Sequence, residues 1–202
     1  WWTWTPGADW RHPEGPGSSL HGRERHPGVH LAYGDAEAYA AWAGKEMPTE
    51  AEWEFAARGG LDGAEFAWGD ELMPKGKPMA NTWQGEFPYE NTLADGYEGT
   101  SPVGTFPANG YGLQDMTGNV WEWTSDWFTH SYEPVSPCCG GDPRAASVDP
   151  NDSAAIPRKV MKGGSHLCAP NYCRRYRPAA RMAQPVDTST SHLGFRGVVR
   201  AP

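Results

Sequence analysis

The sequence predicts an α+β fold in which regular secondary structure is sparse. Two helix signals lie in the first third of the chain, and short β-prone segments are scattered through the rest, a separation typical of the α+β class. The 202 residues include 25 Gly and 19 Pro, which interrupt regular elements, together with 11 Trp. Because disordered chains are poor in aromatic residues, we expect one compact, loop-rich domain over residues 1–202 with a core rich in tryptophan.

The N-terminal part of the chain predicts a loop, a short strand and a helix. Residues 1–16 contain four Trp among Pro and Gly, which favours an irregular, buried loop. Residues 29–33 alternate enough between apolar and polar side chains for a short strand. Asp35 is the predicted N-cap of a helix over residues 36–43, and Gly44 is its predicted stop.

A second helix is predicted from a capping box. In the segment Thr49-Glu-Ala-Glu52, the threonine hydroxyl bonds forward to the backbone and the Glu52 carboxylate bonds back. The helix should run to about Arg58 and end at the following Gly-Gly pair. Its inner face should consist of Trp53, Ala56 and Ala57.

The remaining sequence predicts short strands between turns. Gly or Pro recurs every few residues after Gly60, and no repeat with a period of 20–50 residues is visible. Residues 131–155 are rich in Pro, Gly, Asp and Ser and predict an exposed excursion. The β-prone segments are residues 101–106, 121–127, 159–162 and 194–200.

Composition and motif spacing argue against several function classes. The formal charge of −8 disfavours a nucleic-acid binder, which needs cations spread over one face. No run of 18 apolar residues exists, so we expect no membrane span. The seven histidines match neither H-E-x-x-H nor zinc-finger spacing, which argues against a zinc site.

Cys168 and Cys173 form the most distinctive chemical pattern. They lie on a segment that opens with two glycines and is interrupted by Pro170. Their spacing alone leaves a structural disulfide and a soft-metal site equally open. Between Arg158 and Arg181 the chain has seven Lys or Arg and no acid, and cations near a thiol stabilise its thiolate. Two thiolates suit Cu(I) better than they suit Ca²⁺ or Mg²⁺.

Two other cysteines and two acids complete the candidates. The adjacent Cys138 and Cys139 could form a strained vicinal bridge, bind a metal or stay reduced, and we expect them to be reduced and without function. Asp115 and Glu122 lie on either side of a turn at Gly118. Such hard oxygen donors suit Ca²⁺, although solvated acids and turn caps remain the alternative and the EF-hand pattern is absent.

Several longer motifs carry a family resemblance. Near the C-terminus they are Lys162-Gly-Gly-Ser-His-Leu-Cys168, Tyr172-Cys173-Arg-Arg-Tyr-Arg177, Ala179-Ala-Arg181 and Ser191-His-Leu-Gly-Phe-Arg196. Upstream they are Met47-Pro-Thr-Glu-Ala-Glu-Trp-Glu54, Ala80-Asn-Thr-Trp-Gln-Gly-Glu-Phe-Pro88, Asn109-Gly-Tyr-Gly-Leu113 and Gly118-Asn-Val-Trp-Glu-Trp-Thr-Ser-Asp-Trp127. Together they resemble the formylglycine-generating enzymes, or sulfatase-modifying factors, over nearly the whole chain. The paired cysteines are the specific part of this resemblance, because the other elements also mark a wider superfamily that includes non-enzymes.

The resemblance implies a fold and a chain organisation. The formylglycine-generating fold is related to C-type lectin-like domains and is poor in regular structure. Family members carry a further N-terminal portion with a Gly-x-Phe-x-Met-Gly segment. Since this chain begins at Trp1, we expect it to be a single domain of that family that lacks its N-terminal portion.

The resemblance also implies a reaction. Members use O₂ to convert a cysteine within a Cys-x-Pro-x-Arg motif of an unfolded sulfatase to formylglycine, with Cu(I) held in linear geometry by the residues that match Cys168 and Cys173. Ser165 and Tyr172 match active-site positions and would hold oxygen-derived intermediates or orient the substrate; bonding to local backbone is the alternative. The implied substrate-binding residues are His192, where an Asn is usual, and Trp121. We expect a monomer that acts on a sulfatase polypeptide.

Two structural calcium sites follow from the same resemblance. The first set of ligands is the side chains of Asp115 and Glu122 with the carbonyls of Gly118 and Val120. The second set is Asn81 and Asp95 with the carbonyls of Thr82 and Tyr97.

Two other functions remain open. A non-catalytic, C-type lectin-like binding module is the stronger alternative, because relatives that lack the cysteines are inactive. The presence of both Cys168 and Cys173 favours the enzyme. The related iron-dependent sulfoxide synthases need a site of three histidines, and no such spacing is found.

Overall fold

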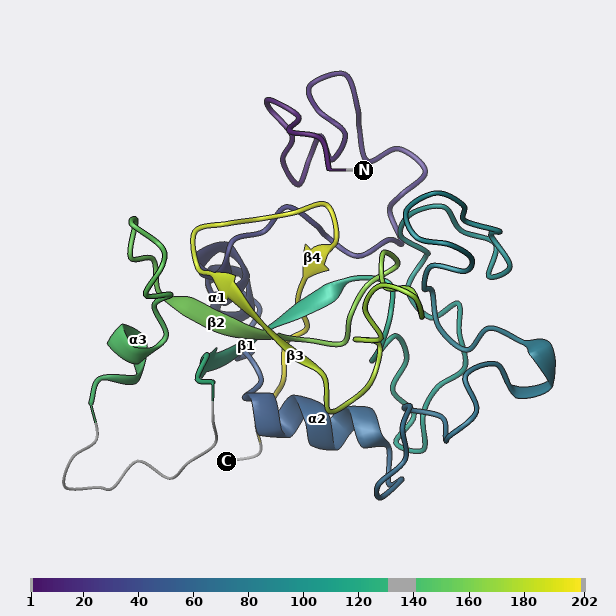
Figure 1. Cartoon of the computed structure of the whole chain (residues 1–202). Helices are drawn as coiled ribbons and strands as arrows, with labels where there is room; N and C mark the ends of the chain where they lie inside the picture. Colours follow the sequence, from purple (N-terminus) through teal and green to yellow (C-terminus); the bar gives the residue numbers. More distant parts are fainter. Residues whose placement is uncertain (1, 131–140, 201–202) are drawn as a thin grey trace.

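The computed structural model describes residues 2–130 and 141–200. It confirms the α+β prediction, with short elements joined by long loops (Figure 1). The described helical elements are α1 (Tyr33–Trp42), α2 (Glu50–Arg58), the 3₁₀ turn η1 (Pro74–Gly76) and α3 (Pro143–Ala146). The described strands are β1 (Trp121–Trp127), β2 (Arg158–Lys162), β3 (Arg181–Pro185) and β4 (Leu193–Gly194).

The four strands form one sheet in the order β3-β2-β1-β4. Strand β2 runs antiparallel to both β1 and β3, whereas β4 runs parallel to β1. Glu122 near the start of β1 therefore lies opposite Lys162 at the end of β2, and Lys162 lies opposite Arg181 at the start of β3. Consequently the loops before β1, after β2, before β3 and before β4 all meet at one end of the sheet.

Three tryptophans form part of the core, as predicted. Trp53 of α2 and Trp121 and Trp123 of β1 are at most 2% exposed. Trp121 and Trp123 share one buried cluster with Tyr176 and Phe66, whereas Trp53 packs in a second with Ala57 and Met116. Helix α2 packs against β1 and β2, which fixes it to the middle of the sheet (Figure 1).

The predicted buried loop at the N-terminus is wrong. Trp2, Trp4 and Trp10 are 55%, 89% and 44% exposed. Most of the segment is drawn as a separate loop beyond the sheet in Figure 1. Its turns are closed by local polar groups, although the Trp2 ring meets the His192 ring edge to face at 5.3 Å. For example, the Asp9 carboxylate accepts the amide hydrogens of residues 11 and 12.

Helix α1 begins earlier than predicted, and the strand before it is absent. Ala32 is the N-cap, and Asp35 lies in the first turn, where its carboxylate accepts the Ala32 amide hydrogen at 3.0 Å. The segment predicted as a strand bonds to two separate places, because the His30 amide donates to Thr190 and the Tyr33 amide donates to Val186. These isolated bonds do not build a ladder.

Helix α2 confirms its predicted capping box. Thr49 Oγ1 accepts the Glu52 amide hydrogen at 3.1 Å, and Glu52 Oε2 accepts the Thr49 amide hydrogen at 2.7 Å. Gly59 ends the helix in the left-handed region, at φ 56°. The predicted inner face is confirmed for Trp53 and Ala57, which are buried, whereas Ala56 is only partly buried.

Of the four strands predicted after Gly60, two are confirmed and two are wrong. Strands β1 and β2 form where expected, but residues 101–106 form turns, and the predicted strand at residues 194–200 shrinks to β4 and one bridge between Glu46 and Val198. Strand β3 was not predicted, because its Arg-Met-Ala-Gln-Pro sequence has no β-branched residue. The described part of the predicted excursion, residues 141–155, is mostly exposed, while its cysteines at 138 and 139 lie outside the described residues.

None of the helices that the structure describes has both the length and the apolar character that a membrane-spanning helix requires.

Candidate functional site

A cavity of about 180 Å³ opens at the end of the sheet where the loops meet. All six residues predicted for the copper, catalytic and substrate roles line it, namely Trp121, Ser165, Cys168, Tyr172, Cys173 and His192. They come from β1, from the segment after β2 and from the residue before β4. The sheet register therefore brings together residues that lie up to 71 positions apart in the sequence.

Two glycines make the turn from β2 into this site. Gly163 and Gly164 have φ values of 94° and 68°, which residues with side chains rarely adopt. A Cβ atom on Gly164 would lie 2.8 Å from the backbone of Arg175 and Tyr176. This close approach places the segment before Cys168 directly against the segment after Cys173.

The two cysteine sulfurs face each other as a reduced pair. Their Sγ atoms are 3.0 Å apart, which is well beyond the bond length of about 2.05 Å in a disulfide. Cys168 is 2% exposed and Cys173 is half-buried. The Ala169 carbonyl accepts the amide hydrogens of both Tyr172 and Cys173. These bonds close a tight turn between the two cysteines.

The two thiols have different acidities. The pKa of the Cys173 thiol falls to about 7, because the Cys168 thiol donates to its thiolate and the Arg175 guanidinium lies nearby. The same hydrogen bond, together with burial, raises the pKa of Cys168. One thiolate stabilised by a neighbouring thiol is therefore the favoured state near neutral pH.

Ser165 and His192 form a hydrogen-bonded pair beside the sulfurs. Ser165 Oγ lies 2.9 Å from His192 Nδ1 and accepts the Leu167 amide hydrogen at 3.3 Å. Burial, with His166 and His30 nearby, lowers the pKa of His192 to about 3. The imidazole is therefore neutral at physiological pH, and its Nδ1 can accept the serine hydroxyl hydrogen.

Sequence reasoning missed several residues that line the cavity. Met182 and Gln184 lie on β3, which was not predicted, and Thr190 lies in the loop between β3 and β4. Arg175 belongs to the basic run that predicted a stabilised thiolate, and the structure places it near the Cys173 thiol. Met161 adds a second thioether beside that of Met182.

The first predicted calcium set lies at a different cavity, of about 530 Å³, which Asp115, Val120 and Glu122 line together with Arg196. Glu122 Oε2 accepts from Trp53 Nε1 and from Arg196 Nε, both at 2.6 Å, and Oε1 accepts from Arg196 Nη2 at 2.7 Å. Burial raises the pKa of Asp115. The Arg196 guanidinium thus already compensates the charge of Glu122.

Gly118 of the first set lies directly against the second predicted set. A Cβ atom on Gly118 would lie 2.4 Å from the Asn81 carbonyl oxygen, which also accepts the Asn119 amide hydrogen at 2.8 Å. Asp95 of the second set accepts hydrogens from the Thr82 amide and from the Tyr97 amide.

An unsatisfied oxygen distinguishes the second set. Asn81 is 1% exposed, and its Nδ2 donates to the Gly99 carbonyl at 2.8 Å. Its Oδ1, in contrast, has no hydrogen-bond partner among the described residues. Within those residues, no three His, Cys, Asp or Glu side chains gather as a metal site, so calcium stays a prediction at both sets.

The chain is similar over nearly its whole length to known proteins. Residues 1–201 match the family model of the sulfatase-modifying factor enzyme 1-like domain. The formylglycine-generating enzyme of Mycobacterium tuberculosis is 58% identical over 98% of this chain and 65% of that protein. The inactive C-alpha-formylglycine-generating enzyme 2 of Mus musculus is 41% identical over 97% of this chain and 56% of that protein.

A solved structure agrees with the family match. The structure of PvdO from Pseudomonas aeruginosa superposes with a TM-score of 0.61 at 30% identity, over 85% of this chain and 60% of that one. These findings confirm the predicted fold class. The chain spans about half to two thirds of the length of the curated relatives it matches.

Proposed function

Because this chain belongs to the family of sulfatase-modifying factor enzyme 1-like domains, we propose that it converts a cysteine of a sulfatase polypeptide to formylglycine. The name of the Mycobacterium tuberculosis relative supports this reaction. One observation carries the proposal: a reduced pair of sulfurs, 3.0 Å apart, lines a cavity at the end of the sheet. A purely structural pair of cysteines would not need a cavity.

Cys168 and Cys173 would hold Cu(I) in this proposal. The donors fit a soft ion, because the two cysteine sulfurs are accompanied by the thioethers of Met161 and Met182, and no Asp or Glu is among the described residues that line the cavity. Bound copper would supply the one-electron chemistry with O₂ that protein side chains do not provide.

The surroundings of the pair prepare the thiols and the substrate. The Arg175 guanidinium and the Cys168 thiol favour the Cys173 thiolate, which is the form that binds a metal. A volume of about 180 Å³ admits a side chain but not a folded segment, so the substrate must present its cysteine from an extended stretch. This fits an unfolded sulfatase chain with a Cys-x-Pro-x-Arg motif.

Three residues would orient that substrate. The Ser165 hydroxyl donates its hydrogen to neutral His192. This hydrogen bond fixes the orientation of the hydroxyl, so the lone pairs of the serine oxygen point in a fixed direction. Tyr172, which is 55% exposed, lies at the mouth of the cavity, where an incoming peptide passes. Trp121 is 2% exposed and belongs to the wall of the cavity.

Calcium is proposed as a structural ion at the second set. The buried Asn81 Oδ1 without a partner supports a cation there, because burying an unpaired carbonyl oxygen is costly. The first set fits a cation less well, since Arg196 already pairs with both oxygens of Glu122.

A non-catalytic binding module is the second candidate. The inactive relative from Mus musculus is 41% identical to this chain over 97% of its length. The family therefore also contains proteins without the activity. The two functions differ in what the cysteines do. An enzyme requires both thiols for turnover, whereas a binding module requires them at most for stability.

A peptide assay tests the proposal. The protein is offered a short peptide that contains Cys-Thr-Pro-Ser-Arg, with Cu(I), a reductant and O₂, and the peptide mass is followed after trapping with a hydrazine. We expect an aldehyde in place of the thiol, and no conversion when the peptide cysteine is Ser, when O₂ is excluded, or in Cys168→Ser and Cys173→Ser.

The control variants are Cys138→Ser and Cys139→Ser, which should convert the peptide normally. Tight peptide binding without any change of mass in the copper-loaded protein would favour the binding module instead.

A further inference from the structure

Residues 84–92 form a loop that lies against the cysteine segment, and we call it the 84–92 loop. Its ends are tied together, because the Thr92 amide donates to the Gln84 carbonyl at 2.7 Å. Gly85 makes this closure possible, since it has a φ of 117° and a Cβ atom there would lie 2.6 Å from the Glu90 carbonyl oxygen. The loop is therefore a closed unit that can be held as one piece.

One side chain of the cysteine segment fastens this loop. Asn171, which lies between the two cysteines, accepts the Phe87 amide hydrogen at 3.3 Å and donates through Nδ2 to the Phe87 carbonyl at 3.2 Å. The same Nδ2 lies 3.1 Å from Glu86 Oε2. These contacts join segments 84 positions apart and fix the backbone of Phe87 next to the site.

The ring of Phe87 then stacks on Tyr172. Their ring centroids are 4.4 Å apart with an interplanar angle of 16°. Phe87 is only 6% exposed, whereas Tyr172 is 55% exposed. A buried, fixed ring thus lies against an exposed ring, so the stack restricts the rotamers of the exposed one.

Trp83 also contacts Phe87. The two rings meet edge to face at 5.0 Å, and the Trp83 indole donates to the Glu90 carbonyl at 2.9 Å. The Trp83 amide donates to the Cys168 carbonyl at 3.1 Å. A continuous path of contacts therefore runs from the backbone of one cysteine through the two aromatic rings to Tyr172, which precedes the other cysteine.

We infer that Phe87 and Asn171 are positioning residues that hold Tyr172 at the mouth of the cysteine cavity in the orientation that receives the substrate peptide. The inference rests on the proposed function for the identity of that peptide. It assigns a role to the 84–92 loop that the sequence did not indicate, because the loop contributes no side chain to the cavity itself. Phe87 and Asn171 therefore affect substrate binding only through Tyr172.

A double-mutant cycle tests this dependence. Binding of a peptide containing Ser-Thr-Pro-Ser-Arg, which cannot turn over, is measured for the unaltered protein, Phe87→Leu, Tyr172→Leu and the double variant. We expect Phe87→Leu to weaken binding about three- to tenfold, the range that one aromatic pair contributes. In the Tyr172→Leu background the same change should have no effect. Phe87→Tyr, which keeps the ring, should bind normally.

The control is Phe55→Leu, which removes another aromatic contact, that of Phe55 with Tyr111 at 5.4 Å, away from the cavity. It should leave peptide binding unchanged. Equal weakening by Phe87→Leu in both backgrounds would overturn the inference, because Phe87 would then act independently of Tyr172.

A spectroscopic readout separates this inference from the proposed function. In protein labelled with fluorotyrosine, the Tyr172 resonance is assigned by its loss in Tyr172→Phe. Because the Phe87 ring lies over it, Phe87→Leu should move this resonance toward its value in an unfolded peptide, and Asn171→Ala should move it in the same direction. If the peptide neither binds nor reacts, the proposed function fails while the stack is still observed. An unchanged resonance in Phe87→Leu would refute the positioning role whatever the activity.

Discussion

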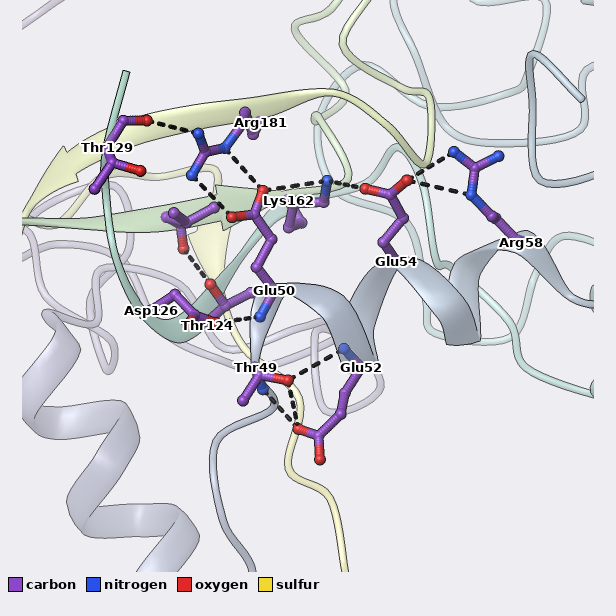
Figure 2. A network of polar contacts seen from close by, with 11 residues as sticks. Thr49, Glu50, Glu52, Glu54, Arg58, Thr124, Asp126, Thr129, Lys162 and Arg181 are labelled. Carbon is purple, nitrogen blue, oxygen red and sulfur yellow. Dashed lines mark hydrogen bonds and ion pairs between the residues drawn. The ribbon is translucent and has the colours of Figure 1, made fainter. Parts of the chain in front are cut away.

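Two polar clusters extend from the end of strand β2, and they differ in how fully their groups are paired. The first, on the side of α2, is built from Glu50 and Glu54 with three cations (Figure 2). Lys162 is 0% exposed, and its Nζ lies 2.9 Å from Glu54 Oε2 and 3.7 Å from Glu50 Oε1. Arg181 donates to both oxygens of Glu50 at 2.8 Å, and Arg58 donates to Glu54. We call this group the α2 charge cluster.

The second cluster lies in the segment that follows β2, at Cys168 and Cys173. Its two sulfurs contact each other and border a cavity, and no carboxylate is among the described residues that line it. In the α2 charge cluster each buried charge has an opposite partner, so little capacity for a ligand remains. The sulfur pair has donor atoms that face open space. Burial alone therefore does not identify a binding site, whereas unused donor capacity beside a cavity does.

Replacing the buried lysine should have the largest effect on stability. Lys162→Met removes the cation shared by the buried Glu50 and the partly buried Glu54, and breaking a buried ion pair in this way costs about 3–5 kcal/mol. Urea unfolding measures the change, with the exposed Lys77→Met as the control. Copper binding by the folded protein should persist. A loss below about 1 kcal/mol would show that the pairing in the α2 charge cluster does not stabilise the fold.

Calcium should have the next largest effect if the unpaired Asn81 Oδ1 marks a site. An ion present at a hundredfold excess over its Kd raises the free energy of unfolding by about 2.7 kcal/mol. This increment should vanish in Asn81→Ala and after chelation. It should survive in Glu122→Gln, because Arg196 already pairs with that carboxylate. Thermal melts with and without calcium measure the increment, and identical melts of the unaltered protein would rule out the structural ion.

The acidity of Cys173 should show a smaller effect. Its pKa is lowered to about 7, so the thiolate forms as the pH rises through 7 instead of near the ordinary value of about 8.5. Because the thiolate is the nucleophile, alkylation by iodoacetamide should reach half its maximal rate near pH 7. In Cys168→Ala the midpoint should move upward, since the thiol donor is lost. A midpoint that is unchanged in Cys168→Ala would contradict the coupling of the two thiols.

Local signals in the sequence predicted those parts of the fold that local interactions determine. The box of Thr49 and Glu52 defined the start of α2, because both partners lie within one helical turn. Helix α1 was placed too late, because its N-cap Ala32 carries no capping side chain. Composition indicated a core rich in tryptophan, but it could not show that Trp2 and Trp4 would be exposed.

The site residues that belong to recognisable sequence motifs were predicted. The cysteine motif and the family resemblance identified all six predicted residues of the cavity, which the sheet register then brought together. Met182 and Gln184 were not predicted, because β3 has no sequence signal of its own. The contacts of Phe87 and Asn171 with the site depend on loop closure between segments 84 positions apart, which no local pattern encodes.

A titration with Cu(I) tests the central claim most directly. Under anaerobic conditions and against a competing chelator, the protein should bind one Cu(I) per chain. Cys168→Ser and Cys173→Ser should each lose that binding while they remain folded, whereas Cys138→Ser should keep it. Full copper binding by either of the first two variants, or no binding by the unaltered protein, would contradict the assignment of the sulfur pair as the metal site.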